Sequence, residues 1–237
     1  MTEINQLPDH WHVFDNAQTL AQQLADTILQ RADQAIQAKG AFHMVLAGGT
    51  SPLNAYRLLA KADAQWAHWH LYLGDERALP SDDPERNSVQ IDQAWLSKVW
   101  VPRTQIHWMP TELGLDLSEK SYQKVLARFF ETHDQFDLVL LGMGEDGHTA
   151  SLFPGHPHPN QAWLVKETHA PKPPAQRLSM NACTLQRTAC LIKLVSGQNK
   201  RDALKQWRAG VSLPINQVNP TPQAATNQQV WIDSHAL

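Results

Sequence analysis

A short apolar run that leads into a glycine-rich polar turn constrains the fold of this chain more than any other stretch. Residues 137–141, DLVLL, are nearly all apolar, which is typical of a strand buried on both faces of a parallel α/β sheet. The turn that follows contains three glycines together with Glu145, Asp146 and His148. Because α/β sheets bind ligands beyond the carboxyl ends of their strands, the pattern predicts a ligand site at this turn. The alternative is a polar loop whose histidine is satisfied by its neighbours.

Strand and helix patterns alternate along most of the chain. We expect strands near residues 12–14, 42–47, 69–74, 106–109, 137–141, 162–166, 177–182, 189–195 and 230–233. We expect helices at residues 17–39, 52–59, 89–96, 118–132 and 197–207. Asn16 and Ser88 are the expected N-caps of the first and third helices, and Gly40 ends the first. The alternation predicts a single α/β domain over residues 1–237, built on a doubly wound sheet.

The composition argues against several classes of protein. The 237 residues include 20 basic and 23 acidic side chains, a net charge of −3, so no basic footprint for nucleic acid is present. No apolar run approaches the ~18 residues that span a bilayer, and the N-terminus lacks a signal pattern. Cys183 and Cys190 lack metal-site spacing, and we expect both to be buried in a reducing compartment. A cytoplasmic protein without nucleic-acid or membrane partners is therefore expected.

Two further strand ends carry polar turns. Residues 48–52, GGTSP, combine glycines, hydroxyls and a helix N-terminus, whose free N–H groups and dipole favour a phosphate. An ordinary strand–helix turn is the alternative, and the P-loop spacing with its lysine is absent. Asp75, Glu76 and Arg77 follow the strand at 69–74, which also indicates the ligand edge, although a solvated charged loop has the same composition.

Three other chemistries fit poorly. Residues 142–147 match the dinucleotide pattern G-x-G-x-x-G, but Pro154 leaves no room for the helix that this fingerprint requires, and the acids would repel a pyrophosphate. Three His-x-His pairs, at 10/12, 68/70 and 156/158, lack a third ligand at diagnostic spacing, so no metal site is expected. A serine nucleophile is disfavoured because no G-x-S-x-G elbow occurs.

The remaining reading is general base catalysis on a small phosphorylated substrate. A histidine side chain with its ordinary pKa near ~6.5 is mostly neutral in cells and can take a proton from water. In this reading His148 is the base and Asp146 orients its ring. Free N–H groups around residues 144–147 are expected to stabilise a developing oxyanion.

Five segments of the chain resemble one known family. They are residues 46–59 (LAGGTSPLNAYRLL), 73–88 (LGDERALPSDDPERNS), 142–155 (GMGEDGHTASLFPG), 172–185 (KPPAQRLSMNACTL) and 194–204 (LVSGQNKRDAL). Each resembles a segment of the 6-phosphogluconolactonases, and the match runs in order from about residue 10 to 235. The segment around His148 is the most specific of the five.

The resemblance implies a Rossmann-like, mostly parallel sheet flanked by helices, as in glucosamine-6-phosphate deaminases and ribose-5-phosphate isomerases. It implies an ester hydrolase that converts 6-phospho-D-glucono-1,5-lactone to 6-phospho-D-gluconate in the pentose phosphate pathway, without a metal or organic cofactor, as a monomer or weak homodimer. By the family pattern, His148 activates water and Asp146 supports it. The residues expected to bind substrate are Gly49, Thr50, Ser51, Arg177 and Lys200 at the phosphate, and Asp75 and Arg77 at the sugar.

Two alternatives stay open on the same scaffold. The related deaminases resemble D-G-H-I-A-F-N-E-P-G in the corresponding loop, with a glutamate five residues after the histidine, whereas this chain has Phe153 there. A non-catalytic sugar-phosphate binder is the other alternative, but a pure binder does not need a base. The chain also departs from the common lactonase pattern at Asn87 and Ser88, where many members read Ser-Asn, and at the order of Thr50 and Ser51.

Overall fold

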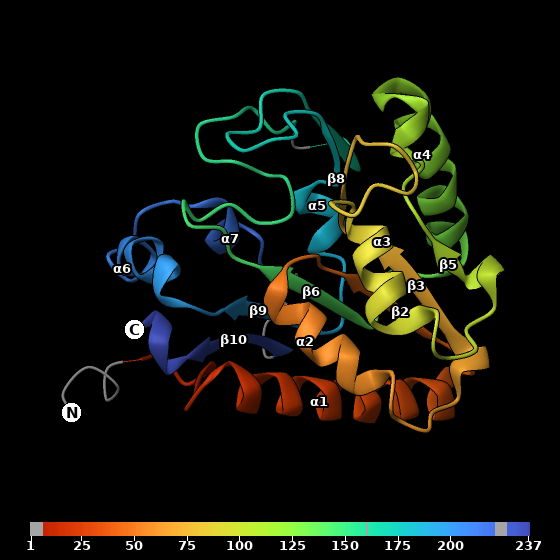
Figure 1. Ribbon diagram of the computed structural model, residues 1–237, viewed down its shortest axis with the longest axis horizontal. Coiled ribbons are helices and arrows are strands. Elements are labelled where there is room, and N and C mark those ends of the chain that lie inside the picture. Colours follow the sequence, from red (N-terminus) through yellow and green to blue (C-terminus); the bar gives the residue numbers. More distant parts are fainter. Residues whose placement is uncertain (1–6, 160, 221–226) are drawn as a thin grey trace.

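The computed structural model describes residues 7–159, 161–220 and 227–237 (Figure 1). Its main sheet has seven strands in the order β1-β10-β9-β6-β2-β3-β5, and every neighbouring pair is parallel. These strands are β1 (Trp11–Phe14), β2 (Phe42–Leu46), β3 (Trp69–Leu73), β5 (Ile106–His107), β6 (Leu138–Gly142), β9 (Leu191–Val195) and β10 (Gln228–Asp233). The α-helices are α1 (Ala17–Lys39), α2 (Thr50–Leu59), α3 (Asn87–Ile91), α4 (Leu115–Thr132), α5 (Ala182–Leu185), α6 (Arg201–Arg208) and α7 (Pro214–Gln217).

The strand order reverses in the middle of the sheet. From β2 the chain adds β3 and then β5 toward one edge, whereas from β6 it adds β9 and then β10 toward the other. β2 and β6 are hydrogen-bonded neighbours, so the reversal lies between them. The predicted doubly wound sheet is therefore confirmed, and open sheets of this kind bind ligands beyond the carboxyl ends of the strands at the reversal.

The first helix begins and ends where the sequence predicts. The side chain of Asn16 accepts hydrogen bonds from the N–H groups of Gln18 and Thr19, each at 2.9 Å. Gly40 has a φ of +82° and ends α1 in the left-handed region, which glycine enters without steric cost. Between these ends the apolar stripe that starts at Leu20 is buried, so α1 packs firmly along the sheet.

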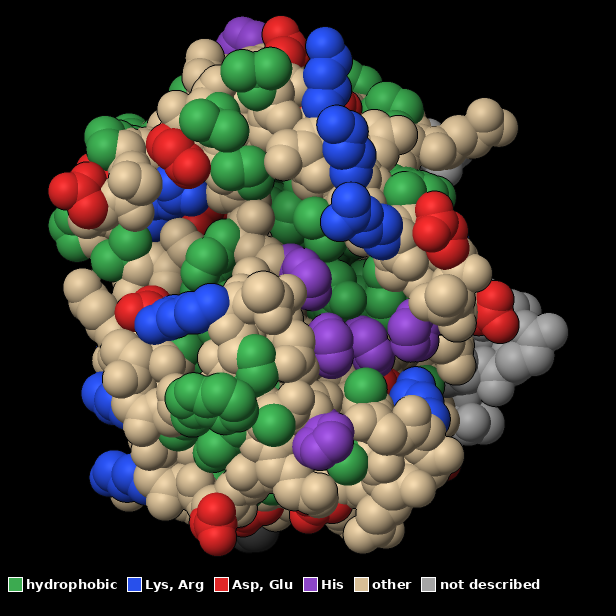
Figure 2. Space-filling model, turned by 90° about the vertical axis from the view of Figure 1, so that its right-hand side faces the viewer, with side chains coloured by type: hydrophobic (Ala, Val, Ile, Leu, Met, Phe, Trp, Pro, Cys, Tyr) green, Lys and Arg blue, Asp and Glu red, His purple; other side chains and the backbone are tan. Residues whose placement is uncertain are grey.

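Helices cover both faces of the main sheet. On one face Trp69 of β3 packs against Trp95, which lies in the π-helical turn (Asp92–Leu96) after α3, and α1 and α2 cover the same side (Figure 1). On the other face the neighbouring residue His70 stacks on His43, whose ring also meets Phe129 of α4. Figure 2 shows histidine side chains gathered on the surface at this edge of the molecule. Adjacent residues of each strand thus enter opposite apolar layers.

A second, antiparallel sheet lies outside the main one and was not predicted. Its order is β4 (Asp75–Arg77), β8 (Arg177–Met180) and β7 (Leu164–Glu167). We expected residues 75–77 only as polar residues beyond a strand, because a three-residue strand is too short to show a period. The pairing sets Arg77 directly opposite Arg177, which lies 100 positions later in the sequence.

Several boundary predictions are wrong, and two of them have a clear cause in the contacts. Ser88 is not the N-cap of the third helix, because it lies inside α3. The N–H groups of Asn87 and Ser88 instead donate to the buried carboxylate of Glu76, at 2.8 and 2.9 Å. The strand expected at 177–182 ends at Met180, because the side chain of Asn181 accepts the N–H of Ala182 and begins α5.

The expectation that both cysteines are buried is confirmed for only one of them. Both cysteines are free thiols, and Cys190 is buried as predicted, whereas Cys183 is only half-buried. Within the described parts of the chain, no helix is long and apolar enough to cross a membrane.

Candidate active site

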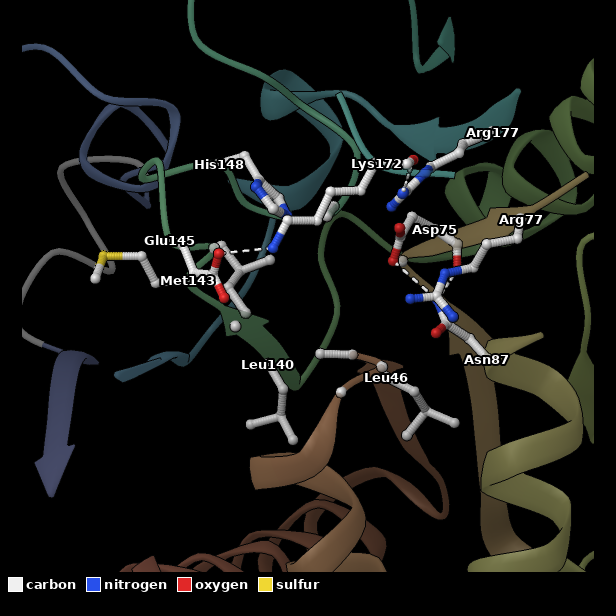
Figure 3. Close-up of a pocket in the computed structure, with 18 of the residues that line it drawn as sticks. Leu46, Asp75, Arg77, Asn87, Leu140, Met143, Glu145, His148, Lys172 and Arg177 are labelled. Carbon is white, nitrogen blue, oxygen red and sulfur yellow. Dashed lines mark hydrogen bonds and ion pairs between the residues drawn. The ribbon is translucent and has the colours of Figure 1, made fainter. Parts of the chain in front are cut away.

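A cavity of about 250 Å³ lies at the reversal of the strand order (Figure 3). Its walls include residues 46–49, which end and follow β2, and residues 140–144, which end and follow β6. Six of the nine predicted site residues line this cavity: Gly49, Asp75, Arg77, His148, Arg177 and Lys200. The cavity therefore brings together side chains from four separate segments at the edge where the sequence predicts a ligand site.

Asp146 stands behind His148 rather than in the cavity wall. One oxygen of its carboxylate, Oδ1, lies 2.5 Å from Nδ1 of His148 and 3.0 Å from the backbone nitrogen of the same residue. A carboxylate can only accept, so Nδ1 carries a proton, and in a neutral ring Nε2 is then the nitrogen with the lone pair. Burial raises the pKa of Asp146, but the hydrogen bonds from His148 outweigh it and bring that pKa to about 2. Asp146 is thus an anion that holds one tautomer of the ring.

The glycines of the turn serve close packing. A Cβ at Gly144 would lie 2.0 Å from Nδ1 of His148, so only glycine lets the ring sit against the backbone. Gly147 has a φ of +83° and lies against Leu213. The N–H of Gly144 donates to the carbonyl of His148 at 2.7 Å, and that of Gly147 donates to the carbonyl of Gly144 at 3.2 Å. Our expectation of free N–H groups at 144–147 is therefore wrong for both glycines.

The dinucleotide reading also fails on the structure. After Gly147 the chain makes a tight turn with a bridge between Thr149 and Leu152, and no helix begins there. A pyrophosphate at this turn would lack the helix N-terminus that the fingerprint supplies.

The residues of β4 divide between the cavity and the protein interior. Asp75 lines the cavity, and its carboxylate accepts hydrogen bonds from Oγ of Ser151 at 2.7 Å and from Nδ2 of Asn87 at 3.3 Å. Glu76 points away and is fully buried, where it accepts three backbone N–H groups and holds the start of α3. Arg77 again lines the cavity, so alternation along the strand separates the structural acid from the two residues predicted to bind the sugar.

Arg177 lies beside Asp75 and Arg77 (Figure 3). Its guanidinium donates to the carbonyls of Pro174 at 3.1 Å and Lys172 at 2.9 Å, which fixes it in the wall. Burial lowers the pKa of Arg177, and the charge of Asp75 opposes that shift. Arg177 lines this cavity together with Gly48 and Gly49, but it does not line the neighbouring cavity that contains Thr50 and Ser51.

A second cavity of about 350 Å³ adjoins the first and contains the other two predicted residues, Thr50 and Ser51. The two cavities share Gly48, Gly49, Gly142, Met143 and Lys200. α2 begins at Thr50, so the N–H groups of its first turn belong to the wall of this second cavity. Burial lowers the pKa of Lys200, which means that an anion brought beside its ammonium would be favourable.

Three polar residues of the cavity wall are not among the nine predicted site residues: Glu145, Lys172 and Asn87. Lys172 extends across the cavity in Figure 3, and its Nζ lies 2.6 Å from Oε2 of Glu145. The other oxygen of Glu145 accepts Nδ2 of Asn199 at 2.7 Å. With Lys172, the wall carries four cationic side chains against two acidic ones, which favours an anionic ligand. Lys172 lies in a proline-rich segment without a period, so no local signal marks it.

The His-x-His pairs do not form a metal site. Among residues 7–159, 161–220 and 227–237, no three histidine, cysteine or acidic side chains converge as ligands. Nδ1 of His156 instead lies 2.7 Å from Oε2 of Glu167, and His70 stacks on His43.

Comparisons with known proteins agree on one family. Residues 15–231 match the family model described as "Glucosamine-6-phosphate isomerases/6-phosphogluconolactonase". The chain is 39% identical over 224 residues to a GDH/6PGL endoplasmic bifunctional protein of Oryctolagus cuniculus, a match that covers 90% of this chain but only 28% of that protein. It is 35% identical over 189 residues to a 6-phosphogluconolactonase of Nostoc sp., covering 76% of this chain and 77% of that protein.

A solved structure has the same fold. The 6-phosphogluconolactonase of Thermotoga maritima superposes with a TM-score of 0.84 at 25% identity, covering 94% of this chain and 98% of that one. The similarity therefore extends over the main sheet and both of its helical layers, not only over the turn around His148.

Proposed function

The chain belongs to the glucosamine-6-phosphate isomerase/6-phosphogluconolactonase family, and from that membership we propose that it hydrolyses 6-phospho-D-glucono-1,5-lactone to 6-phospho-D-gluconate. The family description covers two chemistries, so the assignment depends on the site. Two relatives named above are 6-phosphogluconolactonases, and the match covers most of each of them, which supports the hydrolase.

One observation carries the proposal. The Asp146–His148 pair, joined at 2.5 Å, stands at a cavity whose wall has an excess of two positive charges. An oriented neutral imidazole is suited to take a proton, and an anionic substrate is suited to the charge of the wall. A binding protein would need the second feature but not the first.

The reaction follows from these groups. Nε2 of His148 removes a proton from a water molecule as the oxygen attacks the lactone carbonyl carbon, which gives a tetrahedral oxyanion. The adjacent cationic side chains of the wall stabilise that oxyanion in place of the two engaged glycine N–H groups. The bond between the carbonyl carbon and the ring oxygen then breaks, the imidazolium returns its proton to that oxygen, and a carboxylic acid remains, which ionises.

The phosphate of the substrate would occupy the second cavity. Thr50 and Ser51 offer hydroxyls and the first N–H groups of α2, and Lys200 supplies a charge at the boundary of the two cavities. In this arrangement Asp75, Arg77 and Arg177 face the sugar rather than the phosphate. This differs from the family pattern only in the part assigned to Arg177.

The test is an assay of lactone hydrolysis with the lactone generated in situ. We expect hydrolysis above the spontaneous rate, unchanged by EDTA, and no ammonia from glucosamine 6-phosphate. His148→Ala should lower kcat on the order of 10²- to 10⁴-fold, the range of general base catalysis. The matched control is His12→Ala, because His12 is exposed on β1 at the far edge of the sheet.

Each alternative has its own outcome in that assay. Ammonia release would identify a deaminase, and tight binding of 6-phosphogluconate without turnover would identify a binding protein. Equal rates for the wild type and His148→Ala would refute the assigned base even if hydrolysis is observed.

A further inference from the structure

Phe153 is buried among ionisable side chains rather than in the core. Its side chain is only 2% exposed, yet it lies outside the contiguous hydrophobic core formed by the described residues. Its ring neighbours are His148, Arg177 and His156. A large apolar ring that contacts two predicted functional groups and little of the core is not explained by burial alone.

We infer that Phe153 is a positioning residue that holds the catalytic imidazole and the Arg177 guanidinium at a set distance from each other. The inference rests on the proposed function, because it assumes that His148 is the base. It goes further in naming one side chain on which both groups depend.

The imidazole of His148 contacts the Phe153 ring and the backbone of Gly144. Its ring centroid lies 4.5 Å from that of Phe153, with the planes tilted by 40°. Gly144 is the second contact, since a Cβ there would lie 2.0 Å from Nδ1. The hydrogen bond from Nδ1 to Asp146 fixes the rotation of the ring between these contacts. Without the Phe153 ring, the imidazole could swing away from the cavity while its bond to Asp146 persists.

The guanidinium of Arg177 contacts the same ring. Its Cζ lies 5.5 Å from the ring centroid, within the range of a cation–π interaction. The guanidinium also donates to the backbone carbonyls of Lys172 and Pro174. Phe153 is therefore the only side chain described here with ring contacts to both groups.

The Phe153 ring in turn contacts the ring of His156. Its centroid lies 5.7 Å from that of His156, and Nδ1 of His156 is held by Glu167 at 2.7 Å. The second oxygen of Glu167 accepts the N–H of His169 at 2.6 Å. A Phe153 ring fixed in this way can keep His148 and Arg177 in place. Displacements of reacting groups by about 1 Å can cost on the order of 10²-fold in rate.

The test compares Phe153→Leu with Phe136→Leu, a matched loss of a buried phenyl ring from the core near β6. His148→Ala should lower mainly kcat, and Arg177→Ala should mainly raise KM. We expect Phe153→Leu to move both, with kcat about 10- to 100-fold lower and KM several-fold higher. Phe153→Tyr, which keeps the ring, should retain most of the activity that Phe153→Leu loses. Gly144→Ala should lower kcat, because its Cβ would displace the His148 ring.

A second readout does not need turnover. In histidine-selective NMR spectra, Phe153→Leu should shift the His148 ring resonances, because the phenyl ring current is removed, whereas Phe136→Leu should leave them unchanged. Kinetic constants of Phe153→Leu within about threefold of those of Phe136→Leu, or unchanged His148 resonances, would overturn the inference. If the wild type does not hydrolyse the lactone, the proposed function fails, and the NMR comparison still decides the contact.

Discussion

The histidine cluster on the α4 side of the sheet makes an acid-dependent loss of stability measurable. His43 of β2 stacks on His70 of β3 at 4.6 Å between ring centroids, and its ring lies 4.4 Å from that of His133 at the end of α4. Nδ1 of His43 lies 3.3 Å from the hydroxyl of Tyr72. His107 of β5 stacks on Tyr72 at 4.4 Å and extends the cluster along the same face (Figure 2). Among the residues that the structure describes, no acidic side chain is paired with the His43 ring, and Asp137 instead accepts the backbone N–H of His43 and pairs with Lys39.

The magnitude follows from the pKa of His43. Burial lowers this pKa from 6.5 to about 3, and the charges of His70, His133 and Lys39 act in the same direction. The unfolded chain then takes up the proton more readily than the folded one. The part of the unfolding free energy that depends on a neutral His43 is therefore fully present above about pH 6.5 and is lost as the pH falls toward 3. At about pH 5 the difference amounts to about 2 kcal/mol of unfolding free energy, at 1.36 kcal/mol per pKa unit. The side chain is buried, so solvent screening reduces this value little.

The assay is equilibrium urea unfolding at about pH 7.5 and 5.0. His43→Phe removes the titrating group and keeps an aromatic ring beside Phe129 and Tyr72. The wild type should lose about 2 kcal/mol more than His43→Phe between the two pH values. His12→Phe, at an exposed position on β1, should lose as much as the wild type. Equal losses in the wild type and His43→Phe would refute the reasoning.

Three further predictions concern the site and its support. Asp146→Asn should lower kcat by at least about 10²-fold at nearly constant KM, because an amide no longer selects the Nδ1–H tautomer. In the wild type, the pKa of about 2 predicts that Asp146 stays ionised as the pH falls, until the pH approaches that value. Lys172→Met should raise KM a few-fold, and steady-state assays at increasing salt should reduce the difference, because the side chain is 66% exposed. Glu76→Gln should lower the unfolding free energy measured in urea by about 3 kcal/mol, because an amide donor would face buried N–H groups and Arg86.

Much of the main sheet can be predicted because its signals are local. The runs that became β2 and β6 are apolar at nearly every position, as strands covered on both faces must be. The cap at Asn16 and the stop at Gly40 depend on the side chain and the backbone freedom of those residues themselves. The position of Asp146 and His148 beyond the end of β6 follows from the same information.

Other features depend on partners that are distant in the sequence. α3 begins at Asn87 because Glu76 of β4 accepts its first N–H groups. A prediction from local capping residues alone therefore places the cap at Ser88, which is wrong. The three residues of β4 become a strand only through pairing with β8. The bond between Glu145 and Lys172 joins two segments that carry no common pattern.

The sequence by itself determined the parallel sheet and the place of Asp146 and His148 in the turn after β6, and it predicts a phosphate site at the turn of residues 48–52, since periodicity and turn chemistry are properties of short segments. Only the tertiary structure decided which side chains share a wall. It placed Arg177 in one cavity wall with Asp75 and Arg77, and it turned Phe153 from a residue that distinguishes two families into a contact of His148. The physical reason is that strand pairing and side-chain packing join residues far apart in the chain, and neither leaves a period in the local sequence.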